Sequence, residues 1–216
     1  MNRKQILATV CVMALITVMG MAAGYYTSIR SARNINPGIQ GLLWPNPKQL
    51  APFMTLDDNG NTFGLDRLNG KWSFLFFGYT HCPDVCPITL AVFNQVLQQL
   101  VRDDTTGRVQ MIFVTVDPAR DSAQRLKEYV NYFNSNIIGL GGTDEQVKSL
   151  ASQIGIIYIP GEKTPAGEYY VDHSASVFLV DPRGRLVSVL SPPLEAENIL
   201  ARYRQIRDFI EDQPLS

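Results

Sequence analysis

Three kinds of hydrophobic pattern divide the chain. Near the N-terminus, an apolar run extends from Ile6 to Ala23 with little interruption. Two later runs, WSFLFFGY at 72–79 and VQMIFVTV at 109–116, are continuously apolar over the length of a strand. Elsewhere, apolar residues recur every three or four positions, which is typical of the buried face of a helix. The pattern predicts one membrane-length segment followed by a domain of alternating strands and helices.

The first apolar run is long enough to cross a membrane. As a helix it would rise about 27 Å, close to the roughly 30 Å hydrocarbon core of a bilayer. Arg3 and Lys4 precede the run, and no sharp small-residue cleavage site follows it. We therefore predict a short cytoplasmic start at 1–5 and an uncleaved signal anchor at 6–26, which crosses the membrane once. Prolines and glycines interrupt the next stretch, so 27–52 is predicted to be a flexible linker.

The two strand-like runs flank a helical pattern. Four apolar residues recur between them at helical spacing: Leu90, Phe93, Leu97 and Leu100. A strand, a helix and a strand in this order predict a β-α-β unit with parallel strands and a right-handed crossover.

Two further helices and a hairpin are predicted after this unit. The first helix has Asp121 as its N-cap and an apolar face formed by Leu126, Tyr129, Val130 and Phe133. The second begins with a capping box at Thr143 and Gln146 and ends at Gly155. SVFLV and RLVSVL then flank a turn at 181–184, where proline second and glycine fourth suit a type I turn in an antiparallel hairpin. A last helix has the apolar stripe Ile199, Tyr203, Ile206 and Ile210.

This order of elements predicts an α/β domain with a thioredoxin-like fold over 53–216. An Asn-Gly turn between strand-like pieces at 52–71 adds a β-hairpin in front of the core, as in the peroxiredoxin branch of that fold. The charges nearly cancel, with 19 Lys and Arg against 20 Asp and Glu. Nucleic acid is therefore excluded as a partner, because the chain offers no electrostatic footprint for it.

Chemically reactive residues gather at the end of the first buried strand, in FGYTHCPDVCPITL at 77–90. On a helix, Cys82 and Cys86 would lie on one face about 6 Å apart along the axis, near enough to form a disulfide or to hold one metal ion. Pro87 places Cys86 at the N-terminal edge of the following helix, where the helix dipole favours a thiolate. Cys11 lies within the apolar run and is expected to carry no chemistry.

Three functions would use such a pair of thiols: a thiol-disulfide oxidoreductase, a peroxidase or a metal site. Redox proteins of this fold usually have two residues between the cysteines, whereas three stand between Cys82 and Cys86. A peroxidatic cysteine follows a threonine by three positions, whereas Thr80 is two positions before Cys82. These spacings count against the peroxidase and leave the oxidoreductase, with Cys82 and Cys86 as its catalytic pair, as an alternative to the metal site.

A metal site needs a further ligand, and the chain has two histidines. His81 is adjacent to Cys82 and is expected to be a polar residue beside the site, because adjacent side chains usually diverge. His173 precedes the first strand of the hairpin, and a loop there can reach the same edge of the sheet. If Cys82, Cys86 and His173 converge, two thiolates and one imidazole favour Cu(I) and admit Cu(II), whereas zinc would lack a fourth ligand.

Three motifs in this order resemble the SCO/SenC family of copper-binding proteins. They are FGYTHCPDVCP at 77–87, VTVDPARD at 114–121 and DHSASVFLVDPRG at 172–184. The resemblance implies a tethered thioredoxin-like domain that binds copper through Cys82, Cys86 and His173 and assists assembly of the binuclear copper centre of cytochrome c oxidase. 

The same resemblance implies partners and a location. The client is the copper-bearing subunit of the oxidase, with another copper chaperone as a donor, and the domain faces the periplasm from a bacterial-type inner membrane. The alternative is a periplasmic reductase that keeps the client's cysteines reduced, with a Cys82–Cys86 disulfide in its oxidised form. Asp117, in the second motif, is expected either to orient His173 or a thiolate, or to be a polar cap at the strand end.

Overall fold

The computed structural model describes residues 46–102, 106–165 and 167–212, with residues 5, 13, 16–22, 24 and 43 from the N-terminal part. Two compact units are distinguished, residues 1–40 and residues 41–216. Among the residues described, no helix is both long and apolar enough to span a bilayer. Much of the predicted anchor at 6–26, together with Cys11, lies outside the described residues. The anchor and the short start before it remain predictions.

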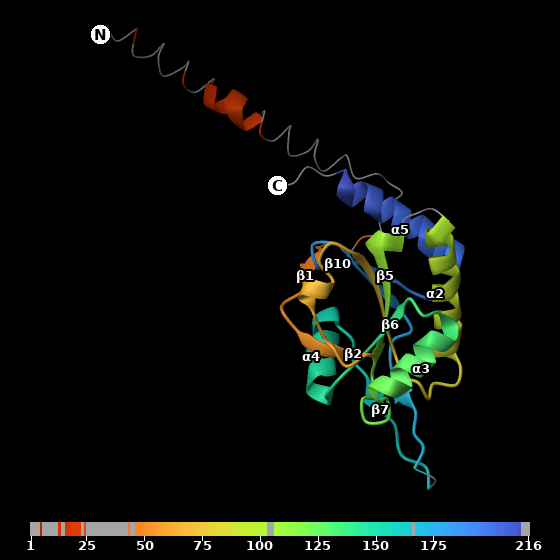
Figure 1. Ribbon diagram of the computed structural model, residues 1–216. Helices are drawn as coiled ribbons and strands as arrows, with labels where there is room; N and C mark the ends of the chain where they lie inside the picture. The colour runs from red at the N-terminus through yellow and green to blue at the C-terminus, as the bar shows by residue number, and fades with distance from the viewer. Residues whose placement is uncertain are drawn as a thin grey trace. The chain divides into compact units, whose positions relative to one another are not determined.

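An eight-stranded mixed sheet lies at the centre of the second unit, in the order β1-β10-β9-β4-β5-β6-β2-β3 (Figure 1). Its strands are β1 (Lys48–Gln49), β2 (Met54–Asp57), β3 (Thr62–Gly64), β4 (Trp72–Gly78), β5 (Val109–Thr115), β6 (Ile137–Gly141), β9 (Val177–Val180) and β10 (Arg185–Leu190). Two short strands, β7 (Ile159–Pro160) and β8 (Val171–Asp172), pair separately. The helices are α2 (Val85–Arg102), α3 (Ala123–Phe133), α4 (Asp144–Ile154) and α5 (Ala196–Glu211).

The predicted β-α-β unit is confirmed. β4 and β5 are parallel and paired along their whole length, from Trp72 opposite Val109 to Gly78 opposite Thr115, and α2 connects them. Both faces of β4 are covered, which explains its continuously apolar sequence. Phe74 and Phe76 point into a core shared with α2, α3 and α5, whereas neighbouring residues of β4 point into a core shared with α4.

The helix boundaries mostly agree with the predictions. α4 has the predicted capping box, with Thr143 accepting from the Gln146 amide, and it ends at Gly155 with a left-handed backbone. The N-cap predicted for α3 is wrong by one residue. Ser122 accepts from the Arg125 amide at 3.2 Å, because the carboxylate of Asp121 turns inward and accepts other hydrogen bonds.

Both predicted hairpins are present. β9 and β10 are antiparallel, and the Gly184 amide donates to the Asp181 carbonyl across their turn. β2 and β3 form the hairpin in front of the core. The closer likeness to the peroxiredoxin branch stays a prediction.

The predicted boundary between linker and domain at residue 52 is too late. β1 pairs with β10, and Leu50 is only 1% exposed, so residues 48–50 belong to the domain. Three further strands, β6, β7 and β8, were not predicted from the sequence. β6 has two glycines within five residues, and β7 and β8 have two residues each. None of the three strands therefore shows the alternation of apolar and polar residues that predicts a strand.

Candidate metal centre

The two cysteines lie at the carboxyl end of β4, on the turn that leads into α2. Because α2 begins at Val85, Cys86 is in its first turn, as predicted. Cys86 is buried and Cys82 is half-buried, and both are free thiols. Gly78 makes room for the inner thiol, since a Cβ at this position would lie 2.7 Å from the Cys86 Sγ atom.

His173 reaches this pair from the far end of the sequence. β9 runs antiparallel to β4, with Val177 opposite Phe76, so the loop before β9 returns to the end of β4 where the cysteines lie. The Nε2 atom of His173 is 3.8 Å from the Cys86 Sγ atom. The donor atoms of Cys82, Cys86 and His173 all lie within 4.8 Å of one another. The structure therefore brings the three predicted ligands together.

The backbone holds His173 in the tautomer that a metal ligand requires. Its Nδ1 atom is 2.9 Å from the Ser174 carbonyl oxygen. A carbonyl can only accept, so Nδ1 carries the proton and Nε2 presents a lone pair to the thiols. The rings of Phe76 and Tyr79 meet the imidazole edge-on, with centroids 6.2 Å and 5.9 Å away, and limit its rotation.

The two thiols share one proton unequally. A hydrogen bond from Cys86 lowers the pKa of Cys82 to about 3, against the opposing effect of burial, and the amides of Asp84 and Cys86 lower it further. The same hydrogen bond and deep burial raise the pKa of Cys86. Cys82 is thus the thiolate of the pair, and its negative charge is solvated by groups at the start of α2.

This donor set fits a copper ion. Metal–sulfur and metal–imidazole bonds of about 2.3 and about 2.0 Å, open at about 120°, place sulfur and nitrogen about 3.7 Å apart. The observed separation of 3.8 Å needs little adjustment. Two sulfurs and one nitrogen favour Cu(I). An open pocket of about 310 Å³ gives access to Cys82 and His173, and its lining includes Tyr79, Asp84 and Tyr170.

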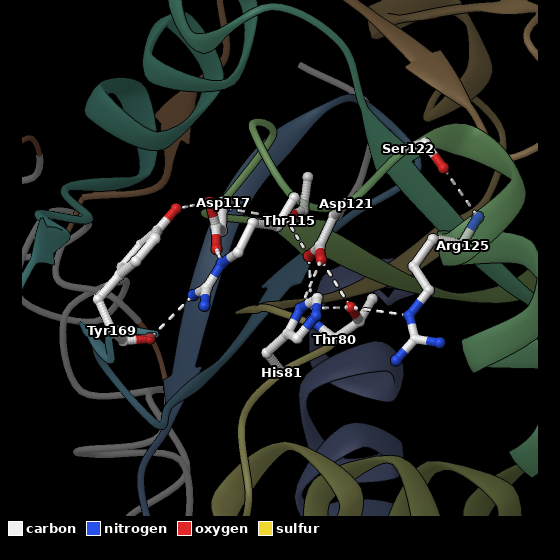
Figure 2. A network of polar contacts seen from close by, with 9 residues as sticks. Thr80, His81, Thr115, Asp117, Asp121, Ser122, Arg125 and Tyr169 are labelled. Carbon is white, nitrogen blue, oxygen red and sulfur yellow. Dashed lines mark hydrogen bonds and ion pairs between the residues drawn. The ribbon is translucent and has the colours of Figure 1, made fainter. Parts of the chain in front are cut away.

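His81 is turned away from the metal donors, as predicted. Its Nδ1 atom lies 3.2 Å from the Thr80 hydroxyl oxygen and 3.6 Å from Asp121 (Figure 2). The Thr80 hydroxyl donates to Asp121 at 2.6 Å, so its oxygen is available to accept from His81. His81 therefore belongs to a polar network beside the site.

Asp117 lies in the same network and is occupied by other partners. Its carboxylate forms an ion pair with Arg120 and accepts from the Tyr169 hydroxyl at 2.7 Å. His173 instead donates to Ser174. Of the two roles expected for Asp117, the polar cap after β5 agrees with these contacts, and direct orientation of His173 does not.

Arg120, Tyr169 and Asp121 are residues beside the site that the sequence pattern did not predict. Arg120 and Asp121 lie within the VTVDPARD motif, which was the available signal, but nothing in the motif shows what they touch. One partner of Arg120, Tyr169, is 49 positions away in the sequence. 

Comparison with known proteins agrees with the geometry. A family model described as SCO1/SenC matches residues 45–208. The chain belongs to the SCO1/SenC family. The structure of yeast Sco1 with copper bound is 33% identical, with a TM-score of 0.69, and the match covers 79% of this chain and 92% of that one. The mixed α/β fold is therefore the thioredoxin-like fold of Sco1 structures, of which the yeast structure named above has copper bound.

Two curated relatives extend the comparison. A protein of Stutzerimonas stutzeri is 36% identical over 167 residues, which are 77% of this chain and 81% of the relative. Mitochondrial protein SCO2 of Saccharomyces cerevisiae is 37% identical over 161 residues, 74% of this chain and 53% of the relative. The chain therefore spans about half the length of this SCO1/SenC relative from yeast.

Proposed function

We propose that this protein is a membrane-anchored copper metallochaperone. It binds one copper ion through Cys82, Cys86 and His173 and assists maturation of the binuclear copper centre of cytochrome c oxidase. The observation that carries the proposal is the convergence of these three donors, with the imidazole tautomer already set for ligation. Copper in the structures of family members such as yeast Sco1 supports it.

The arrangement suits transfer of copper by ligand exchange. Cys82 and His173 line the open pocket, whereas Cys86 is buried beneath them. An incoming thiolate or imidazole of the client can thus replace the outer two ligands one at a time while Cys86 retains the ion. A site with three donors leaves a coordination position for the incoming ligand, which a closed four-ligand site would not. Another copper chaperone could load the site through the same pocket.

Family membership and the N-terminal apolar run support a proposal for the partners and the location. The client is the copper-bearing subunit of the oxidase. The soluble domain lies in the periplasm, and the segment at 6–26 anchors it to a bacterial-type inner membrane in a single pass.

A competitive titration with a colorimetric Cu(I) chelator tests copper binding. The reduced protein is compared with Cys82→Ser, Cys86→Ser and His173→Ala variants. We expect one tightly bound copper per chain and weaker binding in each variant. Unchanged affinity in His173→Ala would show that the three-donor site is wrong.

A second function, as a thiol-disulfide reductase, is favoured by the electrostatics of the thiol pair. Cys82 is half-exposed with a lowered pKa, and Cys86 is a buried partner that can resolve a mixed disulfide. The Cys82 thiolate would attack the client's disulfide, and one client thiolate would leave. The Cys86 thiolate would then displace the second client sulfur, which leaves a Cys82–Cys86 disulfide and a fully reduced client.

Complementation separates the two functions. Cells that lack the protein receive wild type, His173→Ala or Cys86→Ser, and the copper content of the oxidase is measured. Delivery of copper requires His173, whereas dithiol exchange requires only the cysteines. If His173→Ala restores the oxidase fully, the reductase is the correct function and copper delivery is not.

A further inference from the structure

The two loops that carry the metal donors both contact one short turn. This turn, residues 115–121, connects β5 to α3. Its backbone is closed on itself, because the amides of Arg120 and Asp121 both donate to the Asp117 carbonyl, at 3.1 and 3.0 Å. The Asp117 amide in turn donates to the Thr115 hydroxyl oxygen at 2.9 Å. A turn held in this way can act as a common reference for both loops.

Asp121 fastens the cysteine loop to this turn. Its buried carboxylate accepts hydrogen bonds from the Thr80 amide at 3.0 Å and from the Thr80 hydroxyl at 2.6 Å (Figure 2). The Thr115 hydroxyl donates to the same carboxylate at 2.6 Å, which ties it back to the end of β5. Thr80 is two residues before Cys82, whose amide donates to the Tyr79 carbonyl. Asp121 therefore sets where the cysteine loop leaves the sheet.

Arg120 fastens the histidine loop from the other side. Its guanidinium lies 3.6 Å from the centroid of the Tyr169 ring and donates from Nη2 to the Tyr169 carbonyl at 3.0 Å. The Tyr169 hydroxyl donates to Asp117, which also pairs with Arg120, so Tyr169 is held at both ends. Tyr169 is two residues before β8, and β8 leads directly into His173.

Arg120 also touches the wall between the two loops. Its guanidinium carbon lies 5.7 Å from the centroid of the Tyr79 ring. The same ring meets the imidazole of His173 at a centroid distance of 5.9 Å, with the planes nearly perpendicular. Through Tyr79 and Tyr169, Arg120 thus constrains both the ring of His173 and the chain that carries it.

We propose that the turn at 115–121 is a two-sided brace that sets the separation between the cysteines and His173. Arg120 is the positioning residue for the histidine, and Asp121 is the positioning residue for the cysteine loop. The proposal rests on the proposed copper site and adds what holds its donors within bonding reach of one ion. Residues that orient metal ligands commonly change metal affinity about 10–100-fold when they are replaced.

The histidine side is tested with Arg120→Met in the full chain, purified in detergent and titrated with Cu(I) against a chelator. We expect affinity to fall about 10–100-fold. Because Arg120 acts through His173, Arg120→Met should have little effect once His173 is gone. The Cu(I) affinity of the double variant should be within about threefold of that of His173→Ala alone. Arg120→Lys keeps the charge but not the planar fork, so its affinity should be intermediate. Arg108→Met is the matched control, because Arg108 pairs with Glu211 at the other end of β5.

The cysteine side is tested with Asp121→Asn. We expect Asp121→Asn to weaken Cu(I) binding both in the wild-type chain and in the His173→Ala background. It should also change the rate at which Cys82 is alkylated. Asp181→Asn is the matched control for general destabilisation. Asp181 is equally buried and accepts from the Arg183 and Arg185 amides and from the Arg185 guanidinium, but it lies on the turn between β9 and β10. It should leave copper affinity and alkylation unchanged.

An NMR measurement on the metal-free protein tests the brace independently of copper binding. The ¹⁵N and ¹H signals of the His173 imidazole report its tautomer and mobility. Arg120→Met should shift or broaden them, and Arg108→Met should not, whether or not the chain binds copper. The brace is overturned if Arg120→Met leaves these signals unchanged, if it weakens copper binding equally without His173, or if Asp181→Asn reproduces the effects of Asp121→Asn. Failure of the wild-type protein to bind copper would instead overturn the proposed function.

Discussion

At the scale of single residues, the absence of a side chain at Gly78 is as necessary to the site as the donors themselves. A Cβ there would lie 2.7 Å from the Cys86 sulfur and 2.7 Å from the Phe113 ring. Gly78→Ala should therefore displace the inner thiol, weaken Cu(I) binding and reduce stability by about 1–3 kcal/mol, as overpacking does. Chelator titration and urea unfolding measure the two effects. Gly107→Ala is the control, because a Cβ at Gly107 meets nothing within 4 Å.

The lowered pKa of Cys82 predicts that its reactivity with alkylating reagents depends unusually little on pH. The hydrogen bond from Cys86 lowers the pKa of Cys82 to about 3, so Cys82 remains a thiolate as the pH falls. Its alkylation by iodoacetamide should stay fast down to about pH 4, whereas an ordinary thiol with a pKa of about 8.5 slows tenfold per pH unit. Mass spectrometry of the reduced, metal-free protein identifies the modified cysteine. 

Cys86→Ala sharpens this test. Removing the thiol donor should raise the pKa of Cys82 and move the alkylation profile to higher pH, because the first cause of the lowered pKa is gone. An unchanged profile in Cys86→Ala would mean that the amides at the N-terminus of α2, rather than the shared proton, stabilise the thiolate.

At the scale of elements, the sequence predicts a helix end correctly when the residues that cap it are close together in the chain. The capping box of α4 joins Thr143 and Gln146, three residues apart, and was predicted correctly. The cap of α3 was misplaced because Asp121 accepts from Thr80, 41 positions away, and leaves the capping role to Ser122. An aspartate before a helix indicates a cap only when no tertiary partner competes for its carboxylate.

The capping box gives a prediction about stability alone. Thr143→Ala should destabilise the protein by about 1 kcal/mol, because the Gln146 amide loses its acceptor. Copper affinity should not change, since α4 packs on the face of the sheet away from α2. Urea unfolding and chelator titration give the two quantities. Ser149→Ala, within the same helix, should be neutral or slightly stabilising because alanine is the better helix former.

At the scale of the whole molecule, the donors and the brace all lie within the compact unit at 41–216. A chain that begins after Arg30 should therefore fold and bind Cu(I) within about twofold of the full chain, because it keeps the whole of that unit. The full chain should remain in the membrane fraction after a carbonate wash, whereas the shortened chain should not. Loss of copper binding in the shortened chain would contradict this independence.

The sequence by itself determined the chemistry of the site and the order of the main elements. CxxxC at a strand end, the continuously apolar β4 and β5, and the helix stripes are all patterns between residues a few positions apart, so propensity and periodicity reveal them. The resemblance in three motifs added His173. β1 was not predicted because its two residues are too few to show a period, and β6 was not predicted because two of its five residues are glycines.

Only the tertiary structure decided how the donors meet. His173 lies 87 positions from Cys86, and its approach depends on the antiparallel pairing of β9 with β4. Two hydrogen bonds of the brace, from Arg120 to Tyr169 and from Thr80 to Asp121, likewise join residues more than forty positions apart. Such contacts exist because packing of the sheet brings distant loops to one edge, and a pattern read along the chain contains no information about that distance.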